Sequence, residues 1–154
     1  MRFPLASNVI RAHSVRNTFG TVRAYPDGSP KVHQGWDFAA VIGTPCFAIA
    51  DGVVLKVEDR GDYGKQLTID IGGSRFAFYA HMDTIAVKHG WKVTEGQQIG
   101  TTGNTGNAVN LHDADDHLHF EARVTPSPGK GLAGRVSPAA WFPSCPLAVA
   151  VVVP

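Results

Sequence analysis

The feature that most constrains the fold is a series of short segments in which apolar and polar residues alternate. Residues 67–71 alternate strictly, and residues 117–124 do so over a longer stretch. This period of two places successive side chains on opposite faces of a strand. Gly-, Asp- and Asn-rich turns separate the segments, and no stretch of eleven or more residues has a helical apolar period. The sequence therefore predicts an all-β or nearly all-β fold, with an antiparallel sheet arranged as a sandwich or a partly open barrel.

Alternation also predicts which side chains share a face in two further segments. In residues 53–57, the odd-numbered apolar residues are expected to point to one side. In residues 75–81, Phe76 and Phe78 share one face, and His81 is expected to end the strand on the opposite face.

Length and charge exclude several classes of protein. The 154 residues, of which 44% are hydrophobic and 18% charged, suit a single domain with its own core. A net charge of +1 gives no electrostatic basis for binding nucleic acid or an anionic membrane surface. The longest apolar run, residues 147–153, is too short to span a bilayer, and residues 1–11 do not form a recognisable secretory leader.

The two cysteines are too few for a cysteine-rich metal module or a disulfide scaffold. Cys46 and Cys145 can pair in an oxidising compartment, where the bond would close a large loop. Two separate buried thiols are an equally simple interpretation.

Several histidines have spacings that suit a metal site. His33 and Asp37 are four positions apart, and in an extended segment they point to the same side. His117 and His119 present two imidazoles to one polar face of a predicted strand, and His81 ends another strand. Two imidazoles and one carboxylate are a common ligand set for catalytic zinc, which leaves a fourth position for water. Each motif alone is a weak indication, and the two together are much stronger.

Five motifs occur in order along the chain: His33-x-x-x-Asp37, Tyr79-Ala80-His81, Val93-x-x-Gly96-Gln97-x-Ile99-Gly100, Gly103-x-Thr105-Gly106 and His117-Leu118-His119-Phe120-Glu121. With these motifs, the chain resembles the lysostaphin/LytM family of zinc endopeptidases from about residue 19 to residue 124. The resemblance implies one metallopeptidase domain over residues 1–154, with a metal cleft on one sheet face. It leaves an irregular tail over residues 125–154, whose Pro- and aromatic-rich stretch 137–146 is expected to pack against the sheet.

By position, the resemblance implies that His33, Asp37 and His119 bind zinc and that His81 and His117 are the catalytic pair. Zinc lowers the pKa of bound water towards about 7 and polarises the scissile carbonyl. One imidazole can take the proton of the water, and another can stabilise the oxyanion or protonate the departing amine. The sequence does not divide these two tasks between the two histidines. The predicted function is hydrolysis of peptide bonds in the stems or cross-bridges of bacterial peptidoglycan.

One departure from the family pattern is a longer segment over residues 107–116. It contains His112, Asp113, Asp115 and Asp116. A solvated loop is the simpler interpretation because loops tolerate insertion. The alternative is a rim of the substrate groove whose negative charge favours cationic groups. A second metal site in this segment is a weaker hypothesis.

A few other residues have both a structural and a functional interpretation. Glu121 points to the same side as His119, so it can hydrogen-bond to that ring or pair on an exposed strand with Arg123 or water. His13 and His89 lie in no motif and are expected on the surface. The tryptophans are expected in the core or the groove wall rather than in a sugar-stacking platform; they are Trp36, Trp91 and Trp141.

Two alternative functions compete with the endopeptidase. A catalytically inactive domain of the same fold would bind peptidoglycan or activate a partner hydrolase, but all five site residues are present, which disfavours it. Residues 93–100 also resemble the hairpin of lipoyl or biotinyl carrier modules. That interpretation lacks a lysine flanked by Met or Ala at a hairpin tip, and it leaves the histidines unexplained.

A cell-wall enzyme acts in the periplasm or outside the cell, although no leader is visible in this sequence. Release by lysis, delivery by a secretion apparatus and prior removal of a leader would each account for this. Delivery as a toxin would imply an inhibitor or immunity protein as a partner, in addition to peptidoglycan.

Overall fold

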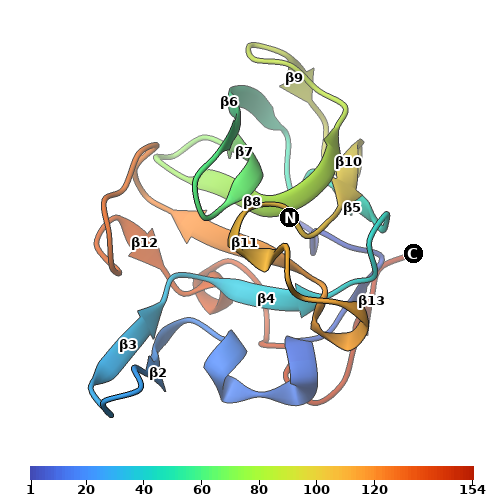
Figure 1. Ribbon diagram of the computed structural model, residues 1–154. Helices are drawn as coiled ribbons and strands as arrows, with labels where there is room; N and C mark the ends of the chain where they lie inside the picture. Colours follow the sequence, from blue (N-terminus) through green and yellow to red (C-terminus); the bar gives the residue numbers. More distant parts are fainter.

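The computed structural model describes residues 1–154, and strands, turns and short 3₁₀ helices account for the regular structure. Nine strands form one main sheet, whose continuous path runs in the order β12-β11-β8-β7-β6-β9 (Figure 1). β4 adds to β11, and β10 joins β8 to β5. These strands are β4 (Trp36–Ala39), β5 (Pro45–Phe47), β6 (Gly52–Arg60), β7 (Gly64–Asp70), β8 (Phe76–Ile85), β9 (Lys92–Val93), β10 (Gln98–Thr102), β11 (His117–Arg123) and β12 (Arg135–Val136).

Two smaller sheets flank the main one. β2 (Gly20–Ala24) pairs with β3 (Pro30–His33), and β1 (Ser7–Asn8) pairs with β13 (Val151–Val152). All the strand pairs are antiparallel, which confirms the predicted fold class. The 3₁₀ helices are η1 (Arg11–His13), η2 (Val15–Asn17), η3 (Gly106–Ala108), η4 (Asp113–Asp115) and η5 (Pro138–Ala140). A helix with the length and apolar character needed to cross a membrane is absent from the structure.

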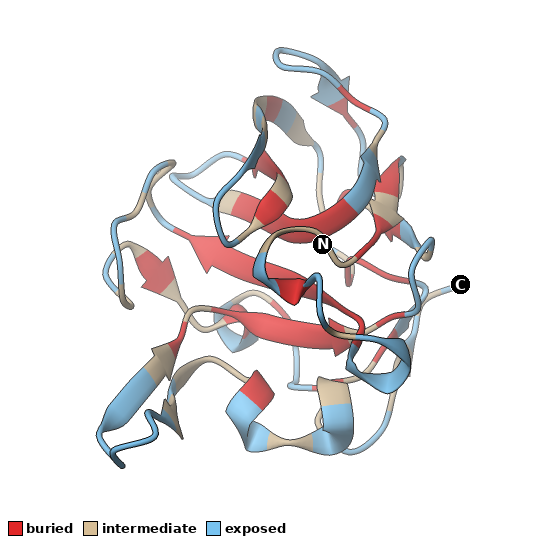
Figure 2. Cartoon of the chain, viewed as in Figure 1, coloured by how far each residue is buried: buried red, intermediate tan, exposed pale blue.

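β11 is the central strand for both the core and the site. All seven of its residues are buried, and β4 and β8 pair with its two edges (Figure 2). Leu118 and Phe120 belong to the hydrophobic core, whereas His117 and His119 lie on the opposite face. The predicted alternation is therefore correct for this strand, and it places two imidazoles on one side of a rigid sheet.

The alternation predicted for residues 53–57 is wrong. Val54 is fully buried in the core, whereas Val53 and Val57 are 42% and 40% exposed. The pairing of β6 with β7 shifts register between Val54 and Lys56. An extra residue of this kind interrupts the two-residue period, so odd-numbered positions no longer share one face.

Both termini contribute to the core. Phe3, Leu5 and Ile10 are buried, and so is Phe142, which lies beyond η5. The rings of Phe3 and Phe142 stack with centroids 4.5 Å apart. The tail does pack against the sheet, as predicted, but β12 and β13 give it regular pairing as well.

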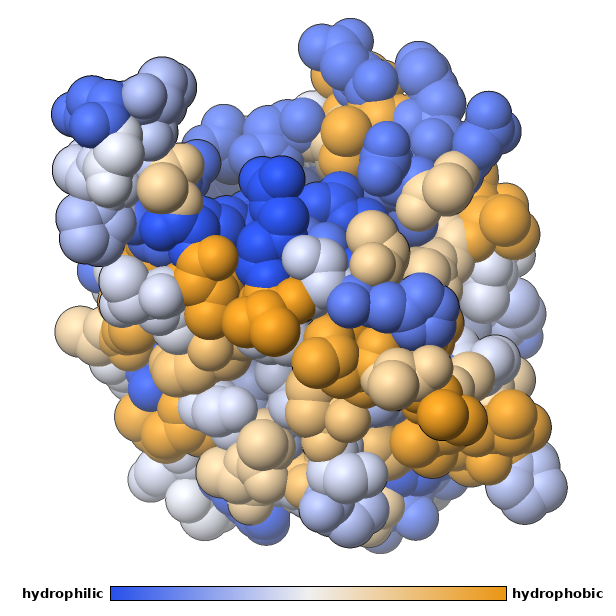
Figure 3. Space-filling model, turned by 90° about the horizontal axis from the view of Figure 1, so that it is seen from below, coloured by the Kyte–Doolittle hydropathy of each residue, from blue (hydrophilic) through white to orange (hydrophobic).

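Cysteine and tryptophan positions settle several expectations. Cys46 is buried, Cys145 is exposed, and the two are not bonded to each other. Trp36 is buried and Trp141 packs against the core, but Trp91 is 47% exposed, so the prediction for Trp91 is wrong. Trp91 ends the turn before β9, in which its amide donates to the carbonyl of Lys88. On the face seen in Figure 3, hydrophilic side chains gather around a recess and apolar groups are interspersed below it.

Candidate metal centre

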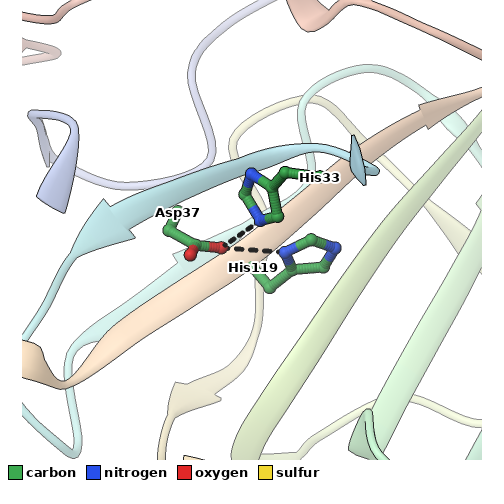
Figure 4. Close-up of side chains that lie close together, drawn as sticks. All are labelled: His33, Asp37 and His119. Atoms are coloured by element: carbon green, nitrogen blue, oxygen red, sulfur yellow. Dashed lines mark hydrogen bonds and ion pairs between the residues drawn. The ribbon is translucent and has the colours of Figure 1, made fainter. Parts of the chain in front are cut away.

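The three residues predicted to bind zinc converge in the structure. Nε2 of His33 and Nδ1 of His119 lie 3.1 Å and 2.8 Å from Oδ1 of Asp37. One ligand atom from each residue lies within 4.8 Å of the other two. The three side chains are buried and point toward one another (Figure 4). Two imidazole nitrogens and one carboxylate oxygen therefore surround a single point, and zinc accepts this donor set.

The turn between β3 and β4 brings His33 beside Asp37. His33 ends β3, and Asp37 lies in β4 directly opposite His119 of β11. Gly35, in the turn, lies against the backbone of β11. A Cβ atom there would come within 2.0 Å of the carbonyl oxygen of Phe120. Glycine is therefore required for the close approach that assembles the cluster.

An acceptor holds the outer nitrogen of each histidine ring. Nδ1 of His33 donates to the carbonyl of Thr18 at 2.8 Å, and Nε2 of His119 donates to Oε1 of Glu121 at 2.9 Å. These partners assign a hydrogen to the nitrogen that faces away from Asp37. A cation at the centre can then use the inner nitrogens, an arrangement that is common around metal-bound histidines.

The charges of the cluster favour a cation at its centre. Burial alone would raise the pKa of Asp37, but hydrogen bonds from His119 and His33 hold it well below its ordinary value. Burial would lower the pKa of His119, but bonds to Asp37 and Glu121 outweigh this effect and raise the pKa to about 9. The same atoms that hold a proton here would bind a metal ion in its place. The residues present therefore fit a divalent cation, and they are consistent with zinc.

Glu121 is fully buried behind His119 and accepts hydrogen bonds on both oxygens. Its Oε1 accepts from His119 and from the hydroxyl of Tyr63. Its Oε2 accepts from Nε of Arg123 and Nε of Arg135, each at 2.7 Å. Burial would raise the pKa of Glu121, but these partners hold it below its ordinary value. The predicted bond to His119 is therefore present, and the pairing with Arg123 is buried rather than exposed.

His81 and His117 lie beside the cluster and face each other. Their ring centroids are 5.1 Å apart, and Nε2 of His117 is 3.8 Å from Oδ1 of Asp37. Nδ1 of His81 donates to the carbonyl of Thr105 at 2.8 Å, which leaves Nε2 without a hydrogen. Burial lowers the pKa of both imidazoles, that of His81 to about 3. Both rings are therefore neutral at pH 7, and Nε2 of His81 is free to accept a proton.

The predicted position of His81 at the end of a strand, on the face away from Phe78, is wrong. β8 continues to Ile85, and His81 lies on the same face as Phe78, with both rings beside Tyr63. Alternation fails because the β7–β8 ladder shifts register here and His81 has a φ of +58°. The amide of His81 donates to the carbonyl of Tyr63 at 2.9 Å, and its ring bonds to Thr105, so the neighbours hold this strained conformation.

A cavity of about 240 Å³ opens over the cluster. Its wall includes three residues that the sequence analysis missed: Arg11, Arg23 and Tyr63. The rings of Tyr63 and His119 are nearly parallel, with centroids 5.5 Å apart. The sequence gives one indication of Tyr63, since it is an aromatic residue within a Gly-rich turn. It gives none for Arg11 and Arg23, which precede the first metal motif.

Residues 107–116 reach the cavity through apolar and amide side chains rather than through their aspartates. Asn107 and Leu111 line it, whereas Asp113 and Asp115 are exposed outside it. The backbone carbonyl of Asp115 lies 2.9 Å from Nδ1 of His117. His33, Asp37 and His119 are the one group that converges closely enough to hold a metal, which disfavours a second metal site in this segment.

Comparison with known proteins gives one family and a consistent set of relatives. The sequence model of peptidase family M23 matches residues 31–131. The peptidoglycan DD-endopeptidase ShyA of Vibrio cholerae is 36% identical over 111 residues, which are 72% of this chain and 25% of ShyA. The chain spans only 24–30% of the length of the first curated relatives that it matches.

Solved structures agree with the sequence relatives. The catalytic domain of the antimicrobial peptidase lysostaphin from Staphylococcus simulans has a TM-score of 0.67 and 28% identity, with 82% of this chain and 90% of that domain covered. A zinc-containing peptidase from Vibrio cholerae has a TM-score of 0.64 and 33% identity, with 85% of this chain and 41% of that one covered. The arrangement of strands around the cluster is therefore shared with peptidases of known structure.

Proposed function

The chain belongs to peptidase family M23, and from this premise we propose that it is a zinc-dependent endopeptidase that hydrolyses peptide bonds of bacterial peptidoglycan. Membership confirms the lysostaphin/LytM resemblance predicted from five sequence motifs. The observation that carries the proposal is the buried convergence of His33, Asp37 and His119. Peptidoglycan as the substrate is supported by the name of ShyA, of which this chain matches a quarter.

The proposed ligands are Nε2 of His33, Oδ1 of Asp37 and Nδ1 of His119. When bound, zinc supplies Lewis acidity that polarises the scissile carbonyl and lowers the pKa of water to about 7. Thr18 and Glu121 hold the outer nitrogens of the two histidines and keep both rings aimed at the centre.

We assign proton transfer to His81. Its Nδ1 hydrogen is held by Thr105, so Nε2 can accept a proton from the attacking water. As the oxygen of the water forms its bond to the carbonyl carbon, His81 takes that proton and then passes it to the departing amine nitrogen. The carbon–nitrogen bond breaks to give a carboxylic acid and an amine, and at neutral pH the acid's proton is transferred to leave a carboxylate and an ammonium group.

His117 is proposed to stabilise the oxygen of the scissile carbonyl. Its Nδ1 lies 2.9 Å from the carbonyl of Asp115 and 3.1 Å from Nη1 of Arg11. A carbonyl can only accept and a guanidinium can only donate, so Nδ1 either donates to Asp115 or accepts from Arg11. We propose the second tautomer, in which the ring hydrogen lies on Nε2, on the side of Asp37. From there it can donate to the developing oxyanion.

Digestion of purified peptidoglycans tests the function. The zinc-loaded chain should release fragments from sacculi with glycine cross-bridges or from sacculi with direct D-alanine to diaminopimelate cross-links, and mass spectrometry of the fragments identifies the bond. His119→Ala should lose both zinc and cleavage, whereas His89→Ala, at an exposed histidine outside the site, should keep both. Binding to sacculi without cleavage by the zinc-loaded chain would instead support the inactive, peptidoglycan-binding alternative.

Action on peptidoglycan would place the chain in the periplasm or the cell wall. The names of the relatives support this location, because they describe peptidoglycan hydrolases. An inhibitor or immunity protein stays a prediction from the sequence.

A further inference from the structure

We propose that Arg11 and Arg23 form a subsite for a carboxylate of the substrate, directly beside the metal centre. The inference rests on the proposed function, because it concerns the peptide whose bond is cut. It assigns the substrate to acidic peptides rather than to uncharged glycine bridges. Both arginines precede residues 31–131, the part of the sequence that matches the family.

The two guanidinium groups line the same cavity as the site histidines. Nη2 of Arg23 lies 3.1 Å from Oδ2 of Asp37, whereas Nη2 of Arg11 lies 3.7 Å away, beyond hydrogen-bond distance. The side chains of Arg11 and Arg23 are 13% and 19% exposed, and that of Asp37 is 3% exposed. The arginines therefore lie between the buried carboxylate and the opening of the cavity.

A buried asparagine holds the two guanidinium groups side by side. Oδ1 of Asn17 accepts from Nη2 of Arg11 at 2.9 Å and from Nη2 of Arg23 at 3.1 Å. Its Nδ2 donates to the backbone carbonyl of Arg11, also at 2.9 Å, and the residue is only 2% exposed. The pair is thus fixed in place before a ligand arrives, which lowers the entropic cost of binding.

The charge on this side of the cavity is not balanced. Oδ1 of Asp37 is directed to the histidines, so a single carboxylate oxygen faces two guanidinium groups. Positive charge remains even before a metal ion adds more. An anion in the cavity would therefore be attracted both by the arginines and by the metal centre.

The second pair of arginines in the molecule shows the contrast. Arg123 and Arg135 both bond to Oε2 of Glu121, and their side chains are only 8% and 3% exposed. Nη1 of Arg135 also donates to the carbonyls of Gly129 and Gly131. These guanidinium groups are enclosed by protein and serve the fold, whereas Arg11 and Arg23 face a cavity.

Donors for a carboxylate are free on the cavity pair. Nε of Arg23 bonds to the carbonyl of Arg16, and its Nη2 bonds to Asn17 and Asp37, but its Nη1 has no partner within the protein. Nε of Arg11 is also without one. Planar guanidinium groups with free N–H donors are well suited to carboxylates, because the hydrogen bonds are charge-assisted.

The position of the subsite limits where the carboxylate belongs on the peptide. Asp37, a proposed metal ligand, is within 4 Å of both arginines, and one extended residue spans at most about 3.6 Å. The carboxylate must therefore belong to a residue that forms the scissile bond or is next to it. Two carboxylates of a peptide can meet this requirement: the one at its C-terminus and the one on an acidic side group.

Four versions of one synthetic stem peptide with a D-alanyl scissile bond test the proposal. Each peptide has two carboxylates beside the bond, one at the C-terminus and one on an acidic side group. In the first peptide both are free, in the second only the C-terminus is amidated, in the third only the side group is amidated, and in the fourth both are amidated. The zinc-loaded enzyme should cleave the preferred acid with a kcat/KM about ten- to a hundred-fold above the doubly amidated peptide. Whichever single amidation removes this preference identifies the source of the carboxylate.

Variants separate substrate recognition from support of Asp37. Arg23→Gln and Arg11→Gln should each lose most of the preference for the acid, and Arg23→Lys should keep part of it because the charge remains. Arg75→Gln, at an exposed arginine in the β7–β8 turn, should keep all of it. Equal losses on acid and amide peptides would overturn the proposal, because arginines that only position Asp37 would act on both substrates alike.

Binding provides a readout that does not depend on turnover. Calorimetry with the zinc-loaded protein should show tighter binding of the acid peptide than of its amide, and Arg23→Gln should remove the difference. Equal affinities would overturn the subsite while the proposed function stands if cleavage occurs. Absence of cleavage with a retained difference in affinity would overturn the proposed function and leave the subsite supported.

Discussion

At the residue scale, Glu121 links the proposed metal centre to the sheet behind it. It holds His119 through one oxygen and two arginines through the other, and its side chain is fully buried. We predict that Glu121→Gln weakens zinc affinity by about 10- to 100-fold, because the amide holds the His119 ring less firmly. Competition with a chelator of known zinc affinity measures the change. Glu58→Gln, at a half-buried glutamate of β6 that pairs with Arg60, is the matched control, and equal zinc affinities in both variants would contradict the prediction.

His81 and His117 lie outside the proposed ligand set, so their variants should differ from ligand variants in zinc retention. His81→Ala and His117→Ala are expected to fold and to keep zinc, since neither is among the three converging residues. His81→Ala should lower the rate of peptide cleavage by about 10²–10⁴, the usual effect of removing a general acid or base. His117→Ala should lower it by about 10²–10³, the usual effect of removing a donor to the oxyanion. Zinc content and turnover on the same peptidoglycan substrate check both statements. Near-normal turnover in both variants would exclude the assigned roles.

The convergence of His33, Asp37 and His119 was predictable because these residues lie in short motifs. His33 and Asp37 are close in sequence, and His117 and His119 flank one residue of a strand, so local geometry brings each pair to one side. Arg11, Arg23 and Tyr63 were not predictable. They reach the cavity through contacts between distant segments, and no local spacing encodes such contacts.

At the element scale, the close packing of the β3–β4 turn on β11 depends on Gly35. We predict that Gly35→Ala lowers both stability and zinc affinity, because the added methyl group would overlap the carbonyl of Phe120. Overpacking of this kind typically costs about 1–3 kcal/mol in the free energy of unfolding. Urea denaturation and zinc titration measure the two effects. Gly129→Ala is the control, since a Cβ atom there meets nothing within 4 Å, and a Gly35 variant as stable as this control would refute the packing argument.

The segment between η3 and β11 should influence substrate choice through Leu111. This side chain lines the cavity, whereas Val109 is 57% exposed and does not. We predict that Leu111→Ser changes the ranking of peptide substrates while zinc binding is retained, and that Val109→Ser changes neither. Relative kcat/KM values over a panel of stem peptides provide the measurement. An unchanged ranking in the Leu111 variant would identify the segment as a tolerated insertion.

Strand existence was predictable from alternation, but the faces of two strands were not. Register shifts occur in the ladders of β6 with β7 and of β7 with β8. Each shift interrupts the alternation, which moved Val54 into the core and His81 to the side of the metal centre. A bulge depends on pairing partners that are distant in sequence, so a pattern within one segment does not reveal it.

At the scale of the whole molecule, the hydrophobic core extends beyond the family match on both sides. The core extends from Phe3 and Ile10 near one terminus to Phe142 near the other. Arg135, also beyond the matched residues 31–131, completes the partners of Glu121. The proposed metal centre is therefore supported by both terminal segments, although motifs within residues 33–121 carry the resemblance.

The aromatic contacts of Phe142 provide a test of this dependence. Its ring stacks on Phe3 at 4.5 Å and lies 5.7 Å from the ring of Phe120, which follows His119 in β11. We predict that Phe142→Ala lowers the free energy of unfolding by about 3–5 kcal/mol, since a large buried ring is removed and a cavity remains. Val149→Ala, at a side chain that is 76% exposed, should change it by less than about 0.5 kcal/mol. Urea denaturation followed by circular dichroism compares the two variants.

A fragment of residues 19–124 should fail to unfold cooperatively, because it lacks both Phe3 and Phe142. Cooperative unfolding of that fragment would show that the core is stable without the terminal segments.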